Sequence, residues 1–109
     1  MVELNEKELE EARSLNQQYQ MVLAQKQALS MRVAELENTL KELENAKGKV
    51  YYGAGSVLIE SDKKTVTERL GTQKKEAETS LETISAREEG VRKKLQEFQK
   101  KIEKQPEKK

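Results

Sequence analysis

A heptad pattern of apolar residues is the feature that most constrains how this chain can fold. In the first half of the chain, apolar residues recur at steps of 3 and 4, with one step of 7 that passes over Lys26. The positions are Ala12, Leu15, Tyr19, Val22, Leu29, Val33, Leu36, Leu40 and Leu43. Such spacing, sustained over more than four heptads, predicts a long helix that buries a narrow stripe against another helix. We expect this helix over residues 4–46, with Lys47 and Gly48 as its stop signal.

A second stripe follows in the other half of the chain. It comprises Val66, Leu70, Gln73, Ala77, Leu81, Ile84, Glu88, Val91, Leu95, Phe98 and Ile102. The steps alternate between 4 and 3, apart from two consecutive steps of 4 at Ala77 that should locally unwind a supercoil. A start signal at Ser61-Asp62 and a stop at Pro106 predict a second helix over 62–104. The tail over 105–109 should be frayed.

Between the helices lies a segment with the signature of a β-hairpin. Residues 49–61 are rich in aromatic and β-branched side chains and are interrupted by Gly55-Ser56, a two-residue turn signal. A turn there pairs Tyr52 with Ile59, and cross-strand partners point to the same face. That face would carry Val50, Tyr52, Ala54, Val57 and Ile59. Because a two-stranded ribbon is marginal in water and has two open edges, we expect it to need partners.

The two expected helices match in length, which predicts that they fold back on each other. Pairing residues whose numbers sum to about 111 places Leu43 near Leu70, Leu15 near Leu95 or Phe98, and Leu9 near Ile102. Residues 2–11 carry five Glu and one Lys, whereas residues 100–109 carry five Lys and two Glu, so an antiparallel arrangement joins opposite charges. The predicted fold is mainly α: an antiparallel two-helix coiled-coil hairpin with one β-hairpin at the bend, within a single domain over 1–109.

Composition excludes several function classes. Ala, Glu, Lys, Leu and Arg supply 60 of the 109 residues, and there is no Cys and no His. Such a composition is typical of long helices, and it excludes thiol and imidazole catalysis and Cys/His zinc sites. A two-helix structure offers no cleft in which acidic pairs such as Glu88-Glu89 could act as acid and base. We therefore expect no enzyme activity and no cofactor.

Other partners and compartments are also disfavoured. No apolar run is long enough to span a bilayer, and the acidic N-terminus is unlike a targeting signal, so a cytoplasmic location is expected. The Lys-rich C-terminal end has no interleaved aromatic residues for base stacking, so we do not expect nucleic acid binding. Met21, Leu23 and Met31 lie outside the first stripe. They either widen the stripe toward the second helix or provide an adaptable binding surface, and the first interpretation is favoured.

The ribbon between two equal helices resembles prefoldin, specifically its β-class subunits. The pattern is carried by Val50, Tyr51, Gly55, Val57, Leu58 and Ile59. The segment over 87–99 also resembles the distal second helix of archaeal β subunits. A single β-hairpin indicates the β class, because α-class subunits have two.

The resemblance implies an ATP-independent chaperone subunit. Two α-type and four β-type prefoldin subunits would join their ribbons into a β-barrel body of a hexamer, and the coiled-coil tips would capture unfolded polypeptides and pass them to a group II chaperonin. Assembly would then use Val50, Tyr51, Tyr52, Gly55, Val57, Leu58 and Ile59. The client-binding tips would use Val2, Leu4, Leu9, Phe98 and Ile102, although Leu9, Phe98 and Ile102 equally fit buried stripe positions. The alternative function is a structural or tethering coiled coil that binds no clients.

Overall fold

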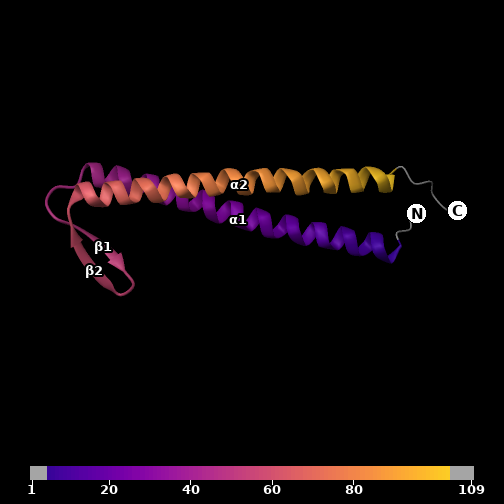
Figure 1. Ribbon diagram of the computed structural model, residues 1–109, viewed down its shortest axis with the longest axis horizontal. Coiled ribbons are helices and arrows are strands. Elements are labelled where there is room, and N and C mark those ends of the chain that lie inside the picture. The colour runs from indigo at the N-terminus through magenta and orange to yellow at the C-terminus, as the bar shows by residue number, and fades with distance from the viewer. Residues whose placement is uncertain (1–4, 104–109) are drawn as a thin grey trace. The chain divides into compact units, whose positions relative to one another are not determined.

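The computed structural model describes residues 5–103, which form two long helices with a β-hairpin between them (Figure 1). The elements are α1 (Glu6–Glu44), β1 (Val50–Ala54), β2 (Val57–Ser61) and α2 (Lys63–Glu103). The predicted fold class is therefore confirmed. Each helix lies inside its expected span, and residues 4 and 104–109 lie outside the described residues.

Helix α1 begins at a capping box, a feature that the heptad pattern does not predict. The Glu8 backbone N–H donates to Asn5 Oδ1 over 2.7 Å, and the Asn5 N–H donates to Glu8 Oε1 over 3.5 Å. This reciprocal pair satisfies two backbone donors that a helix N-terminus otherwise leaves without acceptors. Glu6 and Glu8 also place negative charge in the first turn, where the helix dipole favours it.

The end of α1 is tightened and then closed by a lysine from α2. The Asn45 and Ala46 backbone N–H groups donate to the carbonyls three residues earlier, so the regular helix stops at Glu44, two residues before its expected end at Ala46. The Lys63 ammonium donates to the carbonyl oxygens of Glu44 (2.8 Å) and Ala46 (3.4 Å). A cation therefore occupies the C-terminal end of α1, where the helix dipole is negative. Gly48, at a φ of +87°, then turns the chain toward β1.

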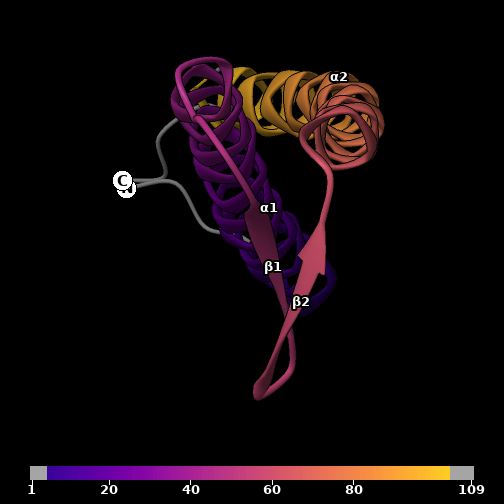
Figure 2. The same ribbon diagram turned by 90° about the vertical axis from the view of Figure 1, so that its left-hand side faces the viewer.

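The β-hairpin has the predicted register. Strands β1 and β2 are antiparallel, with Val50 opposite Ser61, Tyr52 opposite Ile59 and Ala54 opposite Val57. Gly55 has a φ of +63°, whereas no residue other than glycine has a positive φ in the described part of the chain. A positive φ at only the first of two turn residues is the pattern of a type II′ turn, which suits the twist of a hairpin. Figure 2 shows β1 leaving the end of α1 and β2 leading back to α2.

Helix α2 begins at Lys63, directly after the Ser61-Asp62 start signal. The Thr65 N–H donates to Asp62 Oδ1 over 2.6 Å, so Asp62 is the N-cap. Hydrogen bonds from the Thr65 hydroxyl, and then from the Thr65 backbone N–H, hold the pKa of the Asp62 carboxyl below its usual range. These hydrogen bonds favour the charged form of the Asp62 side chain, and the positive end of the helix dipole stabilises the same form.

The described residues divide into two units, each containing a stretch of both helices. The unit over 28–81 contains the hairpin and a cluster in which Leu43, Val50 and Val66 are buried and Ala46, Tyr52 and Leu70 pack against them. This cluster confirms the predicted proximity of Leu43 and Leu70, and it anchors the first residues of β1 onto the helix ends. Glu37 and Lys74 add an ion pair of 3.6 Å between the helices.

The other unit, described over 5–27 and 82–103, is a stretch of paired helix. Its buried residues all belong to the two predicted stripes: Leu15, Val22, Ile84, Val91 and Phe98. Lys26 and Glu88, which are the stripe positions of this unit without an apolar side chain, form an ion pair of 2.7 Å. Within the described residues of the chain, no side chain is less than 2% exposed. Apolar burial is thus confined to a thin seam.

Candidate functional site

The β-hairpin exposes a set of apolar side chains that the rest of its unit does not cover. Leu58 is 75% exposed, Val57 59%, Tyr51 57% and Ile59 37%. We call these four residues the hairpin surface. They come from both faces of the ribbon, since Tyr51 and Leu58 alternate with Val57 and Ile59 along the strands. A concentration of exposed apolar residues on such a short element is typical of an interaction site.

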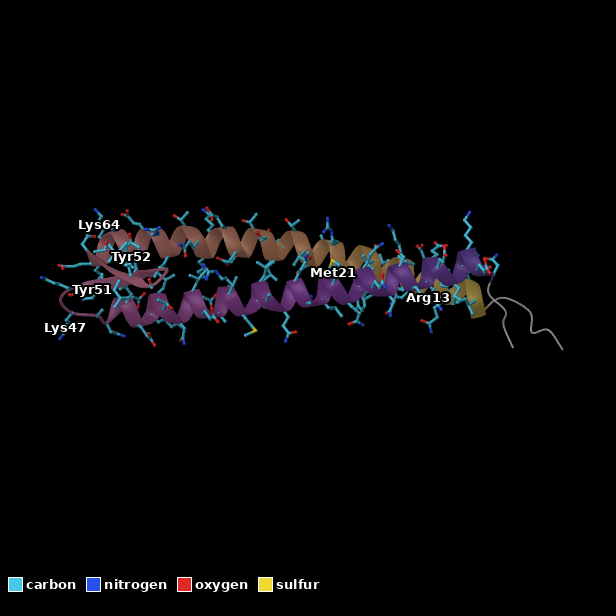
Figure 3. All side chains as sticks on the ribbon, turned by 90° about the horizontal axis from the view of Figure 1, so that it is seen from below. Arg13, Met21, Lys47, Tyr51, Tyr52 and Lys64 are labelled. Carbon is cyan, nitrogen blue, oxygen red and sulfur yellow. The ribbon has the colours of Figure 1, made fainter. Side chains whose placement is uncertain are left out.

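The remaining hairpin residues hold the ribbon in place. Val50 is buried and Tyr52 is half-buried against the helix ends. The Arg69 guanidinium of α2 lies 4.8 Å from the centroid of the Tyr52 ring, within cation–π range. Figure 3 labels the two neighbouring tyrosines on the hairpin. The seven hairpin residues selected from the sequence therefore divide into two anchors, the Gly55 turn and the four residues of the hairpin surface.

The backbone edges of the hairpin are also open to a partner. The sheet contains only β1 and β2 among the described residues, so each strand has one edge without a neighbouring strand. An unpaired edge is a template for adding a strand from another chain. Lys49 and Glu60 form an exposed ion pair of 3.2 Å on the hairpin, and such a pair contributes little to stability.

The candidate client-binding residues behave differently from one another. Leu9 is 40% exposed, Ile102 is half-buried, and Phe98 is buried in the seam at 9% exposure. Val2 and Leu4 lie outside the described residues. Of the three described candidates, Leu9 alone presents a largely exposed apolar side chain.

The contacts not predicted from the sequence include the Lys26–Glu88 ion pair, the Lys63 contact with the α1 carbonyls and the Arg69–Tyr52 contact. Lys26 and Glu88 have a detectable signal, because both occupy stripe positions on facing turns of the antiparallel pair. The Lys63 contact with the α1 carbonyls and the Arg69–Tyr52 contact depend on how the hairpin turns at the helix ends. Helical periodicity does not encode that geometry.

Neither a metal-binding cluster nor a membrane-spanning helix is found in the described part of the chain. Over residues 5–103 there is no group of three or more acidic, His or Cys residues placed to hold a metal ion. In the same residues, neither helix contains a stretch apolar enough to cross a membrane.

The fold and the hairpin surface define an antiparallel coiled-coil subunit with an exposed ribbon, and comparison with known proteins gives its family. The prefoldin subunit family model matches residues 6–109. The chain belongs to the prefoldin family, whose members are chaperone subunits that assemble with other prefoldin subunits into hetero-oligomers.

Individual relatives agree with this assignment. The chain is 30% identical over 89 residues to prefoldin subunit beta of Thermococcus onnurineus, covering 80% of this chain and 77% of the relative. It is 30% identical over 97 residues to prefoldin subunit beta of Saccharolobus islandicus, covering 87% of this chain and 77% of the relative. It is 29% identical over 91 residues to prefoldin subunit beta of Archaeoglobus fulgidus, covering 82% and 78%.

A solved structure supports the fold. The crystal structure of the prefoldin beta subunit from Thermococcus strain KS-1 matches with a TM-score of 0.84 at 24% identity, covering 97% of this chain and all of that one. The relatives at 30% identity, together with this fold, confirm the predicted resemblance to the β class.

Proposed function

We propose that residues 1–109 act as one β-type prefoldin domain in a cytoplasmic, ATP-independent holdase. The subunit joins α-type and other β-type subunits through its hairpin and binds unfolded polypeptides at its helix ends. The observation that carries this proposal is the hairpin surface, in which four apolar side chains stay exposed on a ribbon with two unpaired edges. A tethering coiled coil that works through its helices alone gains nothing from such a surface.

The assembly interface is proposed from the different positions of two groups of hairpin residues, one packed on the helices and one exposed. Val50 and Tyr52 fix the ribbon to the helices, so its outer part is held ready while Tyr51, Val57, Leu58 and Ile59 remain open. Strands from neighbouring subunits would pair the open edges and bury these side chains together. Closure into a barrel removes both liabilities of an isolated ribbon, the exposed apolar faces and the unpaired backbone groups.

Client binding is proposed for the helix ends far from the hairpin in sequence, with Leu9, Phe98 and Ile102 joined by Val2 and Leu4. Unfolded polypeptides expose apolar segments without a fixed sequence, so they are bound by adaptable apolar side chains. Leu9 would act directly. Phe98 and Ile102 would contribute once the last turns of the two helices separate, because the seam covers them when the helices are paired.

The experiment is aggregation suppression by the assembled particle. The chain is combined with an α-class prefoldin subunit, and light scattering follows the aggregation of a chemically unfolded client, with no nucleotide present. Suppression at stoichiometric amounts, followed by recovery of client activity when a group II chaperonin and ATP are added, is the expected result. Aggregation at the rate seen without the particle would contradict the holdase function. Suppression without transfer would contradict only the handover to the chaperonin.

A further inference from the structure

A groove runs along one side of the paired helices in the unit that contains the chain ends. Its first part has a volume of about 490 Å³ and lies between α1 and α2. It is lined by Gln18, Met21, Val22, Gln25, Arg87, Gly90, Val91 and Lys94. A second part, of about 450 Å³, shares Gln18 and Lys94 with the first and continues past Leu15, Glu97 and Phe98 to Glu11 and Lys101. The two parts therefore form one continuous groove.

The charges on the two rims of this groove do not match. The α2 rim carries Arg87, Lys94 and Lys101 at heptad spacing, and the α1 rim carries Glu11, Gln18 and Gln25 at the same spacing. One acid of α2, Glu97, lines the second part of the groove only. Flanking positions of a coiled coil ordinarily pair opposite charges across the seam. Here Arg87 and Lys94 share the first part of the groove with two glutamines and no acid.

Arg87 and Lys94 are also available to an external anion. Within residues 5–103, neither side chain takes part in an ion pair, whereas Lys26 and Arg92 are paired with Glu88 and Glu89. Both cations are exposed. In a chain whose charges balance to a net +1, two unpaired cations beside the first part of the groove, whose lining contains no acid, form a local positive site.

The floor and wall of the same groove are apolar and open. Met21, which is labelled in Figure 3, is 63% exposed. The expectation that Met21 and Met31 widen the buried stripe is therefore wrong, since Met31, which lies outside this groove, is 58% exposed. Methionine is flexible and suits surfaces that adapt to varied partners. Gly90 lies in the groove with nothing within 4 Å of the place where its Cβ would be. A glycine is unfavourable inside a helix, and here it leaves room for a ligand to approach the backbone.

We infer that this groove binds extended segments of non-native polypeptide in which apolar residues are interspersed with Asp or Glu. This inference rests on the proposed holdase function and names a class of client segment and a second binding surface, on the flank of the helix pair. Arg87 and Lys94 are seven residues apart on one helix, or about 10.5 Å along its axis. In the extended polyproline II conformation, which has three residues per turn, acidic residues three positions apart lie on the same side of the segment and are separated by about 9 Å. Two such acids would meet the two cations while the intervening apolar side chain contacts Met21, Val22 and Val91.

The test uses the full chain, alone and assembled with an α-class subunit. Binding is measured by fluorescence anisotropy with labelled peptides of repeated Leu-Glu-Ser, Leu-Gln-Ser and Leu-Lys-Ser units. The parent should prefer the Glu peptide over the Gln peptide and both over the Lys peptide. Replacing both cations (Arg87→Gln with Lys94→Gln) should weaken Glu-peptide binding by about 5-fold, the size expected from two exposed charge contacts. Gln-peptide binding should be unchanged.

The matched control removes two cations from the same helix outside the groove, Lys93→Gln with Lys100→Gln. It makes the same change in net charge and should leave all three affinities within 2-fold of the parent. Gly90→Leu, which fills the groove without meeting a neighbouring side chain at its Cβ, should weaken Glu and Gln peptides alike. The groove inference would be overturned if the Arg87→Gln, Lys94→Gln variant and the control lost Glu-peptide binding equally, or if the parent showed no preference for the Glu peptide. Aggregation suppression by the parent would then still support the holdase function. Failure to bind any peptide, together with failure to suppress aggregation, would overturn the holdase function itself.

Discussion

Lys26 Nζ of α1 lies 2.7 Å from Glu88 Oε2 of α2, and both residues occupy stripe positions that the heptad pattern otherwise gives to apolar side chains. The Lys26 side chain is 39% exposed and that of Glu88 is 16% exposed. A charged pair in an otherwise apolar seam favours the alignment in which its members meet, because any shifted alignment leaves a charge against apolar neighbours. We infer that this pair sets the register of the two helices.

Breaking the pair should therefore cost more than replacing it. Lys26→Met leaves Glu88 without a partner and should lower the free energy of unfolding by about 1–2 kcal/mol, less than for a fully buried pair because Lys26 is partly exposed. The double variant Lys26→Met with Glu88→Leu should match or exceed the parent, since an apolar pair continues the seam. Urea denaturation followed by circular dichroism measures both. A double variant less stable than the single one would contradict the expectation that breaking the pair costs more than replacing it.

Gly71 of α2 should be replaceable with a gain in stability. A Cβ at this position meets nothing within 4 Å, and alanine is favoured over glycine inside a helix, so Gly71→Ala should raise the free energy of unfolding by about 1 kcal/mol. The matched control is Gly55→Ala. It also meets no neighbour, but its φ of +63° should make it destabilising by about 1–2 kcal/mol. Thermal denaturation distinguishes the two signs, and a destabilising Gly71→Ala would show that the glycine has a packing role.

Acid should weaken the start of α2 through Asp62. Because the folded pKa of this carboxyl is below its unfolded value, its contribution is fully present above the usual aspartate pKa and is lost as the pH falls through the lower folded pKa. Asp62→Asn keeps an N-cap acceptor but has no titrating group. Stability measured against pH should therefore decline in this window more for the parent than for the Asn variant. Parallel curves would show that the cap charge does not matter.

A substitution at the helix ends far from the hairpin in sequence should reduce client binding, whereas a substitution elsewhere on the helices should not. Leu9→Ser removes an exposed apolar side chain and should change the free energy of unfolding by less than about 1 kcal/mol, while reducing aggregation suppression by the assembled particle. Met31→Ser is the control, because Met31 is also exposed, at 58% against 40% for Leu9, but lies in the unit that contains the hairpin. Suppression reduced equally by both substitutions would argue against a binding site at the helix ends.

The seam and the hairpin were predictable because both follow from local periodicity. Every expected stripe position, from Ala12 to Ile102, is buried or half-buried, and the pairing of Tyr52 with Ile59 follows once the turn is placed at Gly55-Ser56. A thin two-helix seam has few alternative packings, so the sequence pattern nearly determines it.

The exposure of several apolar side chains could not be predicted from the sequence, because it depends on their tertiary position. Met21 and Met31 are apolar and close to the stripe in sequence, yet each is more than half exposed, because a two-helix seam covers only one narrow side of α1. The sequence also could not show that Phe98 is covered while Leu9 is open, since both fit the same pattern. Burial at the end of a helix pair depends on how far its partner extends and how closely it packs there.

The most direct test of the central claim is the mass of the assembly formed through the hairpin surface. Light scattering is applied to the chain mixed with an α-class prefoldin subunit, for the parent and for Leu58→Asp, a substitution at a side chain 75% exposed in the isolated chain. The parent should form a particle of about 75 kDa, as expected for six chains near the 12.5 kDa of this one. The variant should fold normally but remain in smaller species. A parent that stays a helical dimer with every α-class partner, or a variant that assembles as fully as the parent, would contradict assembly through the hairpin.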